Sequence, residues 1–141
     1  MAQTKAKTVA DVIAGALKVL GPNGENWNNR TLHMPHPKDG HDTYCALGAI
    51  GKAAHGADNY YGRGVEKEAA NLVASCAPKH YFSSYNNYDG GDIPDWNDSL
   101  PAGKQGFRSI KSVFCKALKK AIAQEQPAKR KAVAKKRKKR A

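Results

Sequence analysis

The sequence predicts a mainly α-helical fold: a small four-helix domain, with room for one short β-hairpin, followed by a disordered basic C-terminal tail. In four segments apolar residues recur at spacings of three and four, the period of an amphipathic helix. Runs rich in glycine, proline and asparagine separate these segments. The 141 residues are enough for one domain. We place this domain at residues 1–126 and the tail at residues 127–141.

The first predicted helix spans about 12 residues from position 9. Thr8 followed by Asp11 resembles a capping box, with Asp in place of the usual Glu. Apolar residues then fall on one face as far as Leu20, and Gly21 with Pro22 ends the helix.

Residues 22–43 are rich in Asn, Gly, Pro and His, which predicts a loop, and residues 30–34 have the pattern of a short strand. A second helix is expected from Tyr44 to about Ala54. Asp42 or Thr43 is the predicted cap, and Gly56 lies where the helix should stop. Its many small residues predict that another element packs very closely against it.

A third helix follows "YYGRG" and ends before Pro78. Residues 79–106 are expected to form a long polar and aromatic loop, with a short strand at residues 80–82. The last helix is predicted from Phe107 to Gln124, with one apolar and one basic face. The apolar faces of the four helices predict the core: Val12, Ile13, Leu17, Leu20, Leu47, Ile50, Leu72, Val73, Ile110, Phe114 and Leu118.

Charge is distributed very unevenly along the chain. Residues 104–141 hold 15 Lys or Arg and one acid, whereas residues 1–103 hold 9 basic and 11 acidic residues. Residues 127–141 alone contain 9 Lys or Arg and one branched aliphatic residue, Val133, so they bury too little apolar surface to order by themselves. A near-neutral body with one strongly basic end is typical of proteins that bind polyanions.

The cysteine pattern and the apolar runs favour a cytoplasmic protein. Three cysteines cannot all pair within one chain, and there is no CxxC motif. The first residues lack the continuous apolar core of a signal peptide, and no apolar run approaches the length of a transmembrane helix. We therefore expect neither a signal peptide nor a membrane-bound state.

The segment "TLHMPHPKDGHDTYC" raises the question of a metal site. His33 and His36 could form one ligand pair, with His41 and Cys45 as the other. However, two prolines stiffen the first pair, and three histidines with one thiolate are an uncommon structural zinc set. We expect no metal and no cofactor, and keep these four residues as the alternative.

Cys45 is also the candidate for a cysteine nucleophile. A cysteine in the first turn of a helix feels the positive end of the helix dipole, which lowers its pKa. The base could then be His80, His41 or His55. The orienting group could be Asp95, Asn97 or Asp98, and His80 with Asp98 is the set that we keep as the alternative. Because Cys45 begins an apolar face of small residues, we favour a core residue and a non-catalytic protein; Cys76 and Cys115 are also assigned to the core.

The motifs "YCALGAI" and "IPDWND", about fifty residues apart and followed by an amphipathic helix, carry a family resemblance. The chain resembles, over roughly residues 8–123, a family of uncharacterised bacterial and bacteriophage proteins that is labelled a domain of unknown function. That resemblance implies a small, mainly helical, phage or prophage protein and carries no established activity. The family-type positions are Cys45, Gly48, Ala49, Trp96, Asn97 and Asp98.

The loop around residues 80–98 has further features. Its aspartates lack the distal Glu of a calcium loop. We expect Trp96 to anchor the loop on the core, with Asn97 and Asp98 as local backbone caps. Its tyrosines suit a protein interface, so an inhibitor or adaptor that binds a host or virion protein through residues 80–98 is a second alternative.

The basic end predicts the function that we favour, an accessory protein that binds DNA or RNA without sequence preference. No helix-turn-helix, RNP or zinc-finger signature adds base readout, and no lipid anchor favours a membrane. The sequence does not predict the oligomeric state. The predicted contact residues are Arg108, Lys116, Lys119, Lys120, Lys129, Arg130, Lys131, Lys135, Lys136, Arg137, Lys138, Lys139 and Arg140.

Overall fold

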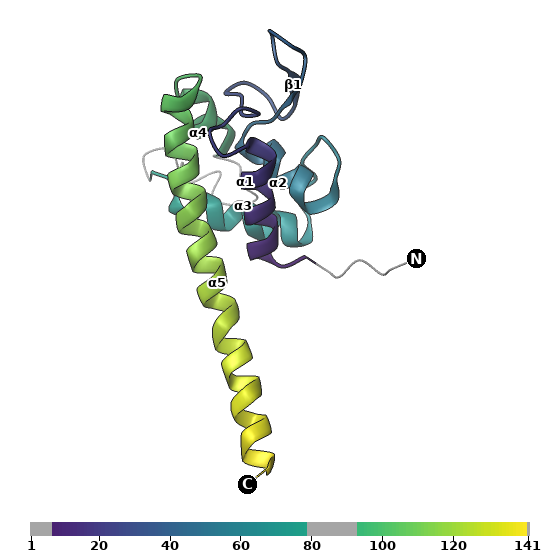
Figure 1. Cartoon of the computed structure of the whole chain (residues 1–141), viewed down its shortest axis with the longest axis vertical. Helices are drawn as coiled ribbons and strands as arrows, with labels where there is room; N and C mark the ends of the chain where they lie inside the picture. Colours follow the sequence, from purple (N-terminus) through teal and green to yellow (C-terminus); the bar gives the residue numbers. More distant parts are fainter. Residues whose placement is uncertain (1–6, 79–92, 141) are drawn as a thin grey trace.

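The computed structural model describes residues 7–78 and 93–140, without the side chains of residues 94, 95 and 126–140. Within this part the fold is mainly helical, with one small two-stranded hairpin, as predicted (Figure 1). The elements are α1 (Val9–Leu20), β1 (Met34–Pro35), β2 (Asp42–Thr43), α2 (Ala46–His55), α3 (Gly64–Cys76), α4 (Ile93–Ser99) and α5 (Lys104–Arg140).

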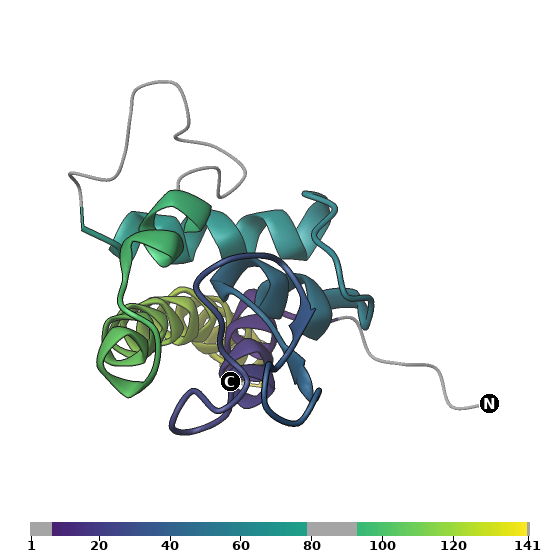
Figure 2. The ribbon, with the colours of Figure 1, turned by 90° about the horizontal axis from the view of Figure 1, so that it is seen from above.

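The helix α1 confirms the prediction at both ends. The Thr8 hydroxyl accepts a hydrogen bond from the Asp11 amide, and the Asp11 carboxylate accepts one from the Thr8 amide. Gly21 is the C-cap, with φ of 86°. The buried face of α1 packs mainly against α2, and α5 packs against α1 and α3 (Figure 2).

The start of α2 differs from the prediction. The N-cap is Cys45, whose Sγ accepts a hydrogen bond from the Gly48 amide at 3.4 Å. Asp42 and Thr43 instead form β2, which pairs antiparallel with β1. The predicted stop is confirmed, because Gly56 caps α2 in the left-handed conformation.

The close packing expected around the small residues of α2 is also confirmed. A Cβ atom on Gly48 would lie 2.0 Å from the Leu32 carbonyl oxygen, and one on Gly51 would lie 2.0 Å from the Asn59 carbonyl oxygen. Loop backbone therefore lies directly on this helix, at two sites that exclude any side chain.

The helix α4 corrects the prediction of a continuous loop over residues 79–106. Trp96 and Asn97 lie on this short helix and are 1% and 0% exposed. Ile93 is buried as well, so packing against the core stabilises a segment with little helical propensity of its own. The predicted strand at residues 80–82 lies outside the described residues.

The last helix also differs from the prediction. It was expected to end near Gln124 with a disordered segment after Pro127, but α5 continues to Arg140 and projects from the rest of the domain (Figure 1). Proline removes one amide donor and crowds the preceding turn, whereas the Ala, Lys and Arg that follow are strong helix formers. These residues allow the helix to continue through the basic segment.

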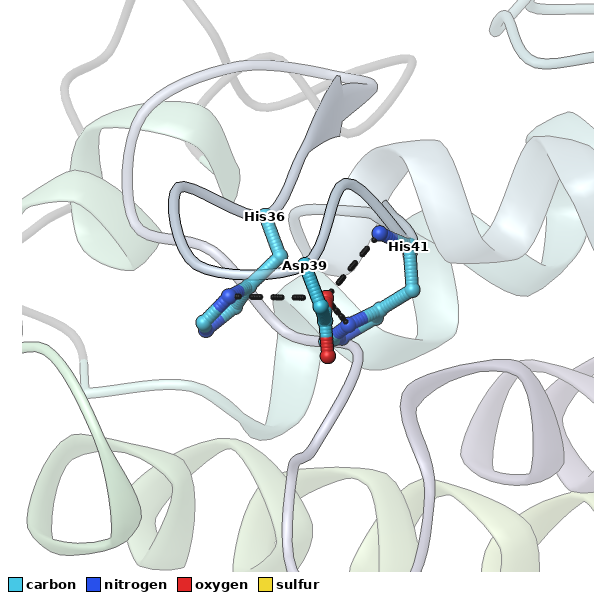
Figure 3. Close-up of side chains that lie close together, drawn as sticks. All are labelled: His36, Asp39 and His41. Atoms are coloured by element: carbon cyan, nitrogen blue, oxygen red, sulfur yellow. Dashed lines mark hydrogen bonds and ion pairs between the residues drawn. The ribbon is translucent and has the colours of Figure 1, made fainter.

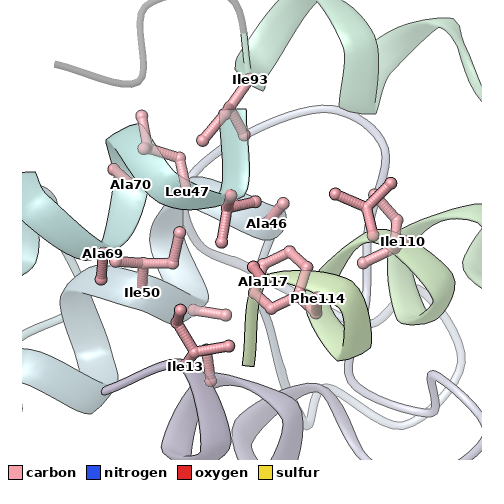
Figure 4. Close-up of a cluster of buried hydrophobic side chains, with 14 of the residues drawn as sticks. Ile13, Ala46, Leu47, Ile50, Ala69, Ala70, Ile93, Ile110, Phe114 and Ala117 are labelled. Atoms are coloured by element: carbon pink, nitrogen blue, oxygen red, sulfur yellow. The ribbon is translucent and has the colours of Figure 1, made fainter. Parts of the chain in front are cut away.

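The core lies where α1, α2, α3 and α5 meet (Figure 4). Eight of the eleven predicted core residues are buried, whereas Leu17, Leu72 and Leu118 are only partly buried. The core also contains Trp27, Tyr44 and Ile93, which loops and α4 bring into it and which no helical pattern predicts. Cys45 is a core residue as favoured, whereas Cys76 and Cys115 are only half-buried.

Candidate functional site

The solvent face of α5 carries the predicted basic residues of the folded domain. Arg108, Lys116, Lys119 and Lys120 are all exposed, and Ile110, Phe114 and Ala117 on the opposite face are buried. None of these four cations forms an ion pair with a described residue. Their charge is therefore open to solvent. Nine further Lys and Arg follow in the same helix after residue 126.

The hairpin places a different cluster together: His36, Asp39 and His41. Backbone bonds from the His36 amide to the His41 carbonyl (2.8 Å) and from the Gly40 amide to the His36 carbonyl (2.9 Å) close the turn. Each of the three residues offers one ligand atom, and these atoms lie within 4.8 Å of one another. Figure 3 shows the contacts that join Asp39 to both histidines.

Hydrogen bonds shift the ionisation of two groups in this cluster. The pKa of the Asp39 carboxyl is lowered, chiefly because the His41 amide donates to it and then because of the His41 ring. The pKa of His41 is raised, first by its hydrogen bond to the Glu25 carbonyl and then by Asp39. Asp39 and His41 therefore favour each other's charged forms.

The four residues kept as the alternative metal site do not converge on one point. His33 turns to Asp42, with Nε2 2.8 Å from Oδ1, and packs at 5.1 Å against the Tyr44 ring. Cys45 is buried at the start of α2. Asp39, which is not among the four residues grouped from the sequence, joins His36 and His41 instead. The spacing His-x-x-Asp-x-His around a glycine turn is the signal that could have found it.

A cavity of about 420 Å³ lies beside this cluster. His36 and Pro37 form part of its wall. Arg30, Lys104 and Asn28 also line the cavity. The wall also contains Glu25 and the apolar side chains of Trp27 and Met34, so its chemical character is mixed.

The environment of Cys45 does not match that of an activated nucleophile. Burial raises the pKa of its thiol to about 11, and the nearby Asp98 carboxylate adds to the rise. This direction is opposite to the predicted effect of the helix dipole. His80, the proposed base, lies outside the described residues.

Asn97 has a structural role within the described fold. Its side-chain oxygen accepts hydrogen bonds from the Trp27 indole at 2.7 Å and from the Ala46 amide at 3.0 Å. Its amide nitrogen donates to the Asn28 carbonyl at 3.1 Å. Asn97 thereby links α4 to the loop before the hairpin and to the start of α2, which is a longer-range role than the local cap that we expected. Trp96 is buried as expected.

His55 and Glu66, which line a second cavity, form a pair with a structural role. The buried Glu66 carboxylate accepts bonds from the Tyr61 and Gly62 amides, and its other oxygen lies 2.5 Å from His55 Nε2. His55 Nδ1 accepts a hydrogen bond from the Ala57 amide. Both ring nitrogens are engaged, so the pair holds the loop between α2 and α3.

A comparison with protein families places these residues in context. A model described as a family of unknown function (DUF6197) matches residues 4–105, which is more than half of the chain. The chain belongs to this family. No curated protein and no solved structure matches it.

The DUF6197 match divides the candidate residues into two groups. The hairpin cluster, Cys45 and Asn97 lie inside residues 4–105, whereas almost all of α5 lies outside. No helix in the described part of the chain is both long and apolar enough to cross a membrane.

Proposed function

We propose that the protein is a non-catalytic accessory protein that binds DNA or RNA non-specifically through α5. The proposal includes the setting predicted from the sequence, the cytoplasm of a bacterial or phage-infected cell. The observation that supports it best is the exposed face of α5, whose Arg108, Lys116, Lys119 and Lys120 have no ion-pair partner among the described residues.

The first argument concerns the density of charge along α5. The helix spans 37 residues, or roughly 55 Å at 1.5 Å per residue. It holds 15 Lys or Arg against one acid, Glu125. Double-stranded DNA presents one phosphate per about 1.7 Å of its axis, so a long basic helix can neutralise several phosphates at once.

The second argument concerns separation of the two faces. The residues that anchor α5 in the core, such as Ile110 and Phe114, lie opposite Arg108 and Lys119. The helix can therefore contact a polyanion along its solvent side while its apolar side remains packed on α1 and α3. Contacts of this kind go to phosphates and give affinity without sequence preference.

The test is the salt dependence of binding to labelled DNA and RNA of unrelated sequences. We expect the full chain to give a slope of log K against log salt of about −5 to −8. Changing Arg108, Lys116, Lys119 and Lys120 together to Gln should make that slope less steep by up to about 3–4, because each lost phosphate contact removes roughly 0.9. A chain ending at Gln126 should lose most of its affinity.

A matched control removes the same charge elsewhere. Changing Lys18, Lys38, Arg63 and Lys67 to Gln lowers the net charge equally but leaves α5 intact. This control should retain the slope of the unchanged protein. The proposal fails if the full chain does not bind at about 50–150 mM salt, where such contacts should be measurable. It also fails if both quadruple variants weaken binding equally, because net charge rather than α5 would then explain the affinity.

A further inference from the structure

The three side chains of the hairpin cluster meet two requirements of a metal site: suitable donor atoms and close approach. His36 and His41 lie opposite each other across the turn. Their ring centroids are 4.6 Å apart and their ring planes are inclined by 14°. Asp39 Oδ1 contacts His41 Nδ1 and lies 3.7 Å from His36 Nδ1. A tetrahedral ion with bonds of about 2.0–2.1 Å holds its ligand atoms roughly 3.3 Å apart. Because the two ring planes are nearly parallel, the partly exposed His36 ring and the exposed Asp39 side chain must rotate before all three ligand atoms point at one ion.

The outer hydrogen bond of His41 is the second observation. Its Nε2 lies 2.9 Å from the Glu25 carbonyl oxygen, which can only accept, so Nε2 carries the proton. The Nδ1 of the same ring faces the Asp39 carboxylate, which is another acceptor. With Nε2 as the donor to Glu25, the Nδ1 lone pair of His41 faces the Asp39 carboxylate, so both atoms are available to bind one ion.

This arrangement is the usual one for a histidine that binds a metal. Ligating histidines commonly donate their second ring N–H to a backbone carbonyl or carboxylate, which fixes the ring and its tautomer. Here Glu25 supplies that carbonyl from a different loop, 16 residues before His41. The ligand is therefore positioned by the fold and not only by its neighbours in the turn.

The binding of His36 involves an exchange of partners. Its Nδ1 accepts a hydrogen bond from the Lys38 amide at 3.1 Å. An ion on Nδ1 would replace this exposed hydrogen bond. The loss costs little free energy because the Lys38 amide can donate to water instead.

From this geometry we propose that His36, Asp39 and His41 bind one divalent transition-metal ion, of which zinc is the best match. Two imidazoles and a carboxylate favour zinc, nickel or copper over calcium and magnesium, which prefer all-oxygen sites. Three protein ligands leave a coordination position for water or an anion, as in open zinc sites. This site is independent of the proposed nucleic-acid binding, because it uses none of the α5 residues.

The experiment is a calorimetric titration of the full chain with zinc chloride, in a buffer that does not bind metals, after treatment with a chelator. We expect one ion per chain with a dissociation constant below about 100 μM. His36→Ala, Asp39→Ala and His41→Ala should each weaken binding at least tenfold, since even the loss of an outer-shell partner costs 10–100-fold. Circular dichroism should show that the three variants stay folded.

His33→Ala is the matched control, because it removes a neighbouring histidine that pairs with Asp42 in the same hairpin region. It should change zinc affinity by less than about twofold. In the unchanged protein, imidazole ¹⁵N signals of His36 and His41 should respond to zinc, and those of His33 should not. Binding weaker than about 100 μM, equal loss in His33→Ala, or unchanged affinity in the His36 and His41 variants would each overturn the proposal.

Discussion

Replacement of Asn97 by Ala should destabilise the fold more than its small size suggests. The side chain is 0% exposed and connects three segments that are distant in sequence: α4, the loop at Trp27 and the start of α2 at Ala46. Removing the amide leaves the Trp27 indole N–H and the Ala46 amide without their acceptor. It also removes the donor to the Asn28 carbonyl.

The expected magnitude follows from those groups. A buried donor left without a partner costs about 1–3 kcal/mol, and two such donors are created. Partial relaxation and entry of water reduce the sum. We therefore expect the free energy of unfolding of Asn97→Ala to fall by about 2–4 kcal/mol. Asn97→Leu fills the space but leaves both donors unpaired, so it should lose a similar amount.

The assay is urea unfolding followed by far-UV circular dichroism, with tryptophan fluorescence as a second probe. Asn23→Ala is the control, because Asn23 is exposed, and it should change stability by less than about 0.5 kcal/mol. A loss below about 1 kcal/mol in Asn97→Ala would refute the hydrogen-bond argument. Full stability in Asn97→Leu would show that packing, rather than hydrogen bonding, makes Asn97 important.

Three further predictions use the same unfolding and titration methods. Gly48→Ala should lower the free energy of unfolding by about 1–3 kcal/mol, because its Cβ would lie 2.0 Å from a carbonyl oxygen. Gly15→Ala is the control: its Cβ would meet the Ala53 side chain at 3.1 Å, so the change should stay within about 1 kcal/mol. Equal losses in the two variants would contradict this prediction. Cys45 should resist thiol reagents at pH 7 until the protein unfolds, since a pKa of about 11 leaves only about one thiolate in ten thousand; stoichiometric labelling of the native protein would favour the enzyme alternative. The pKa of Asp58 is lowered, first by the Tyr44 hydroxyl, so its contribution to stability is present above the unfolded value of about 3.9 and is lost as the pH falls through the lower folded value. In an NMR titration, Tyr44→Phe should raise the pKa of Asp58, and an unchanged value would contradict the assignment.

The elements that the sequence predicted well are those with a local cause. The capping box at Thr8 and the glycine stop at Gly56 depend on a few adjacent residues, so pattern alone locates them. The helix α4 has only a weak local signal: Pro94 and Asp95 suit a first turn, but seven residues are too few to show an apolar period. It forms because Trp96 and Asn97 find partners in distant segments, and such tertiary stabilisation is invisible in a window of sequence.

The candidate site was predicted in part for a similar reason. The sequence grouped His33, His36, His41 and Cys45 by proximity along the chain. Folding separates them because the hairpin turns His36 and His41 toward each other while Cys45 begins a buried helix. Asp39 joins the cluster only once Gly40, with φ of 75°, closes the turn. The ligand set therefore depends on turn geometry, which the spacing of histidines and cysteines does not encode.

The two faces of α5 connect the fold to the proposed function. Ile110, Phe114 and Ala117 complete a core whose other helices lie inside the DUF6197 match, although the match itself ends at Gln105. The exposed face contributes charge and almost no packing. Neutralising Arg108 and Lys119 should thus weaken nucleic-acid binding without lowering the free energy of unfolding. A smaller side chain at Phe114 should instead lower the free energy of unfolding and leave nucleic-acid binding unchanged while the domain stays folded. The hairpin lies at the far end of the molecule from the C-terminus of α5 (Figure 1), so zinc binding should be the same in both kinds of variant as long as the domain stays folded.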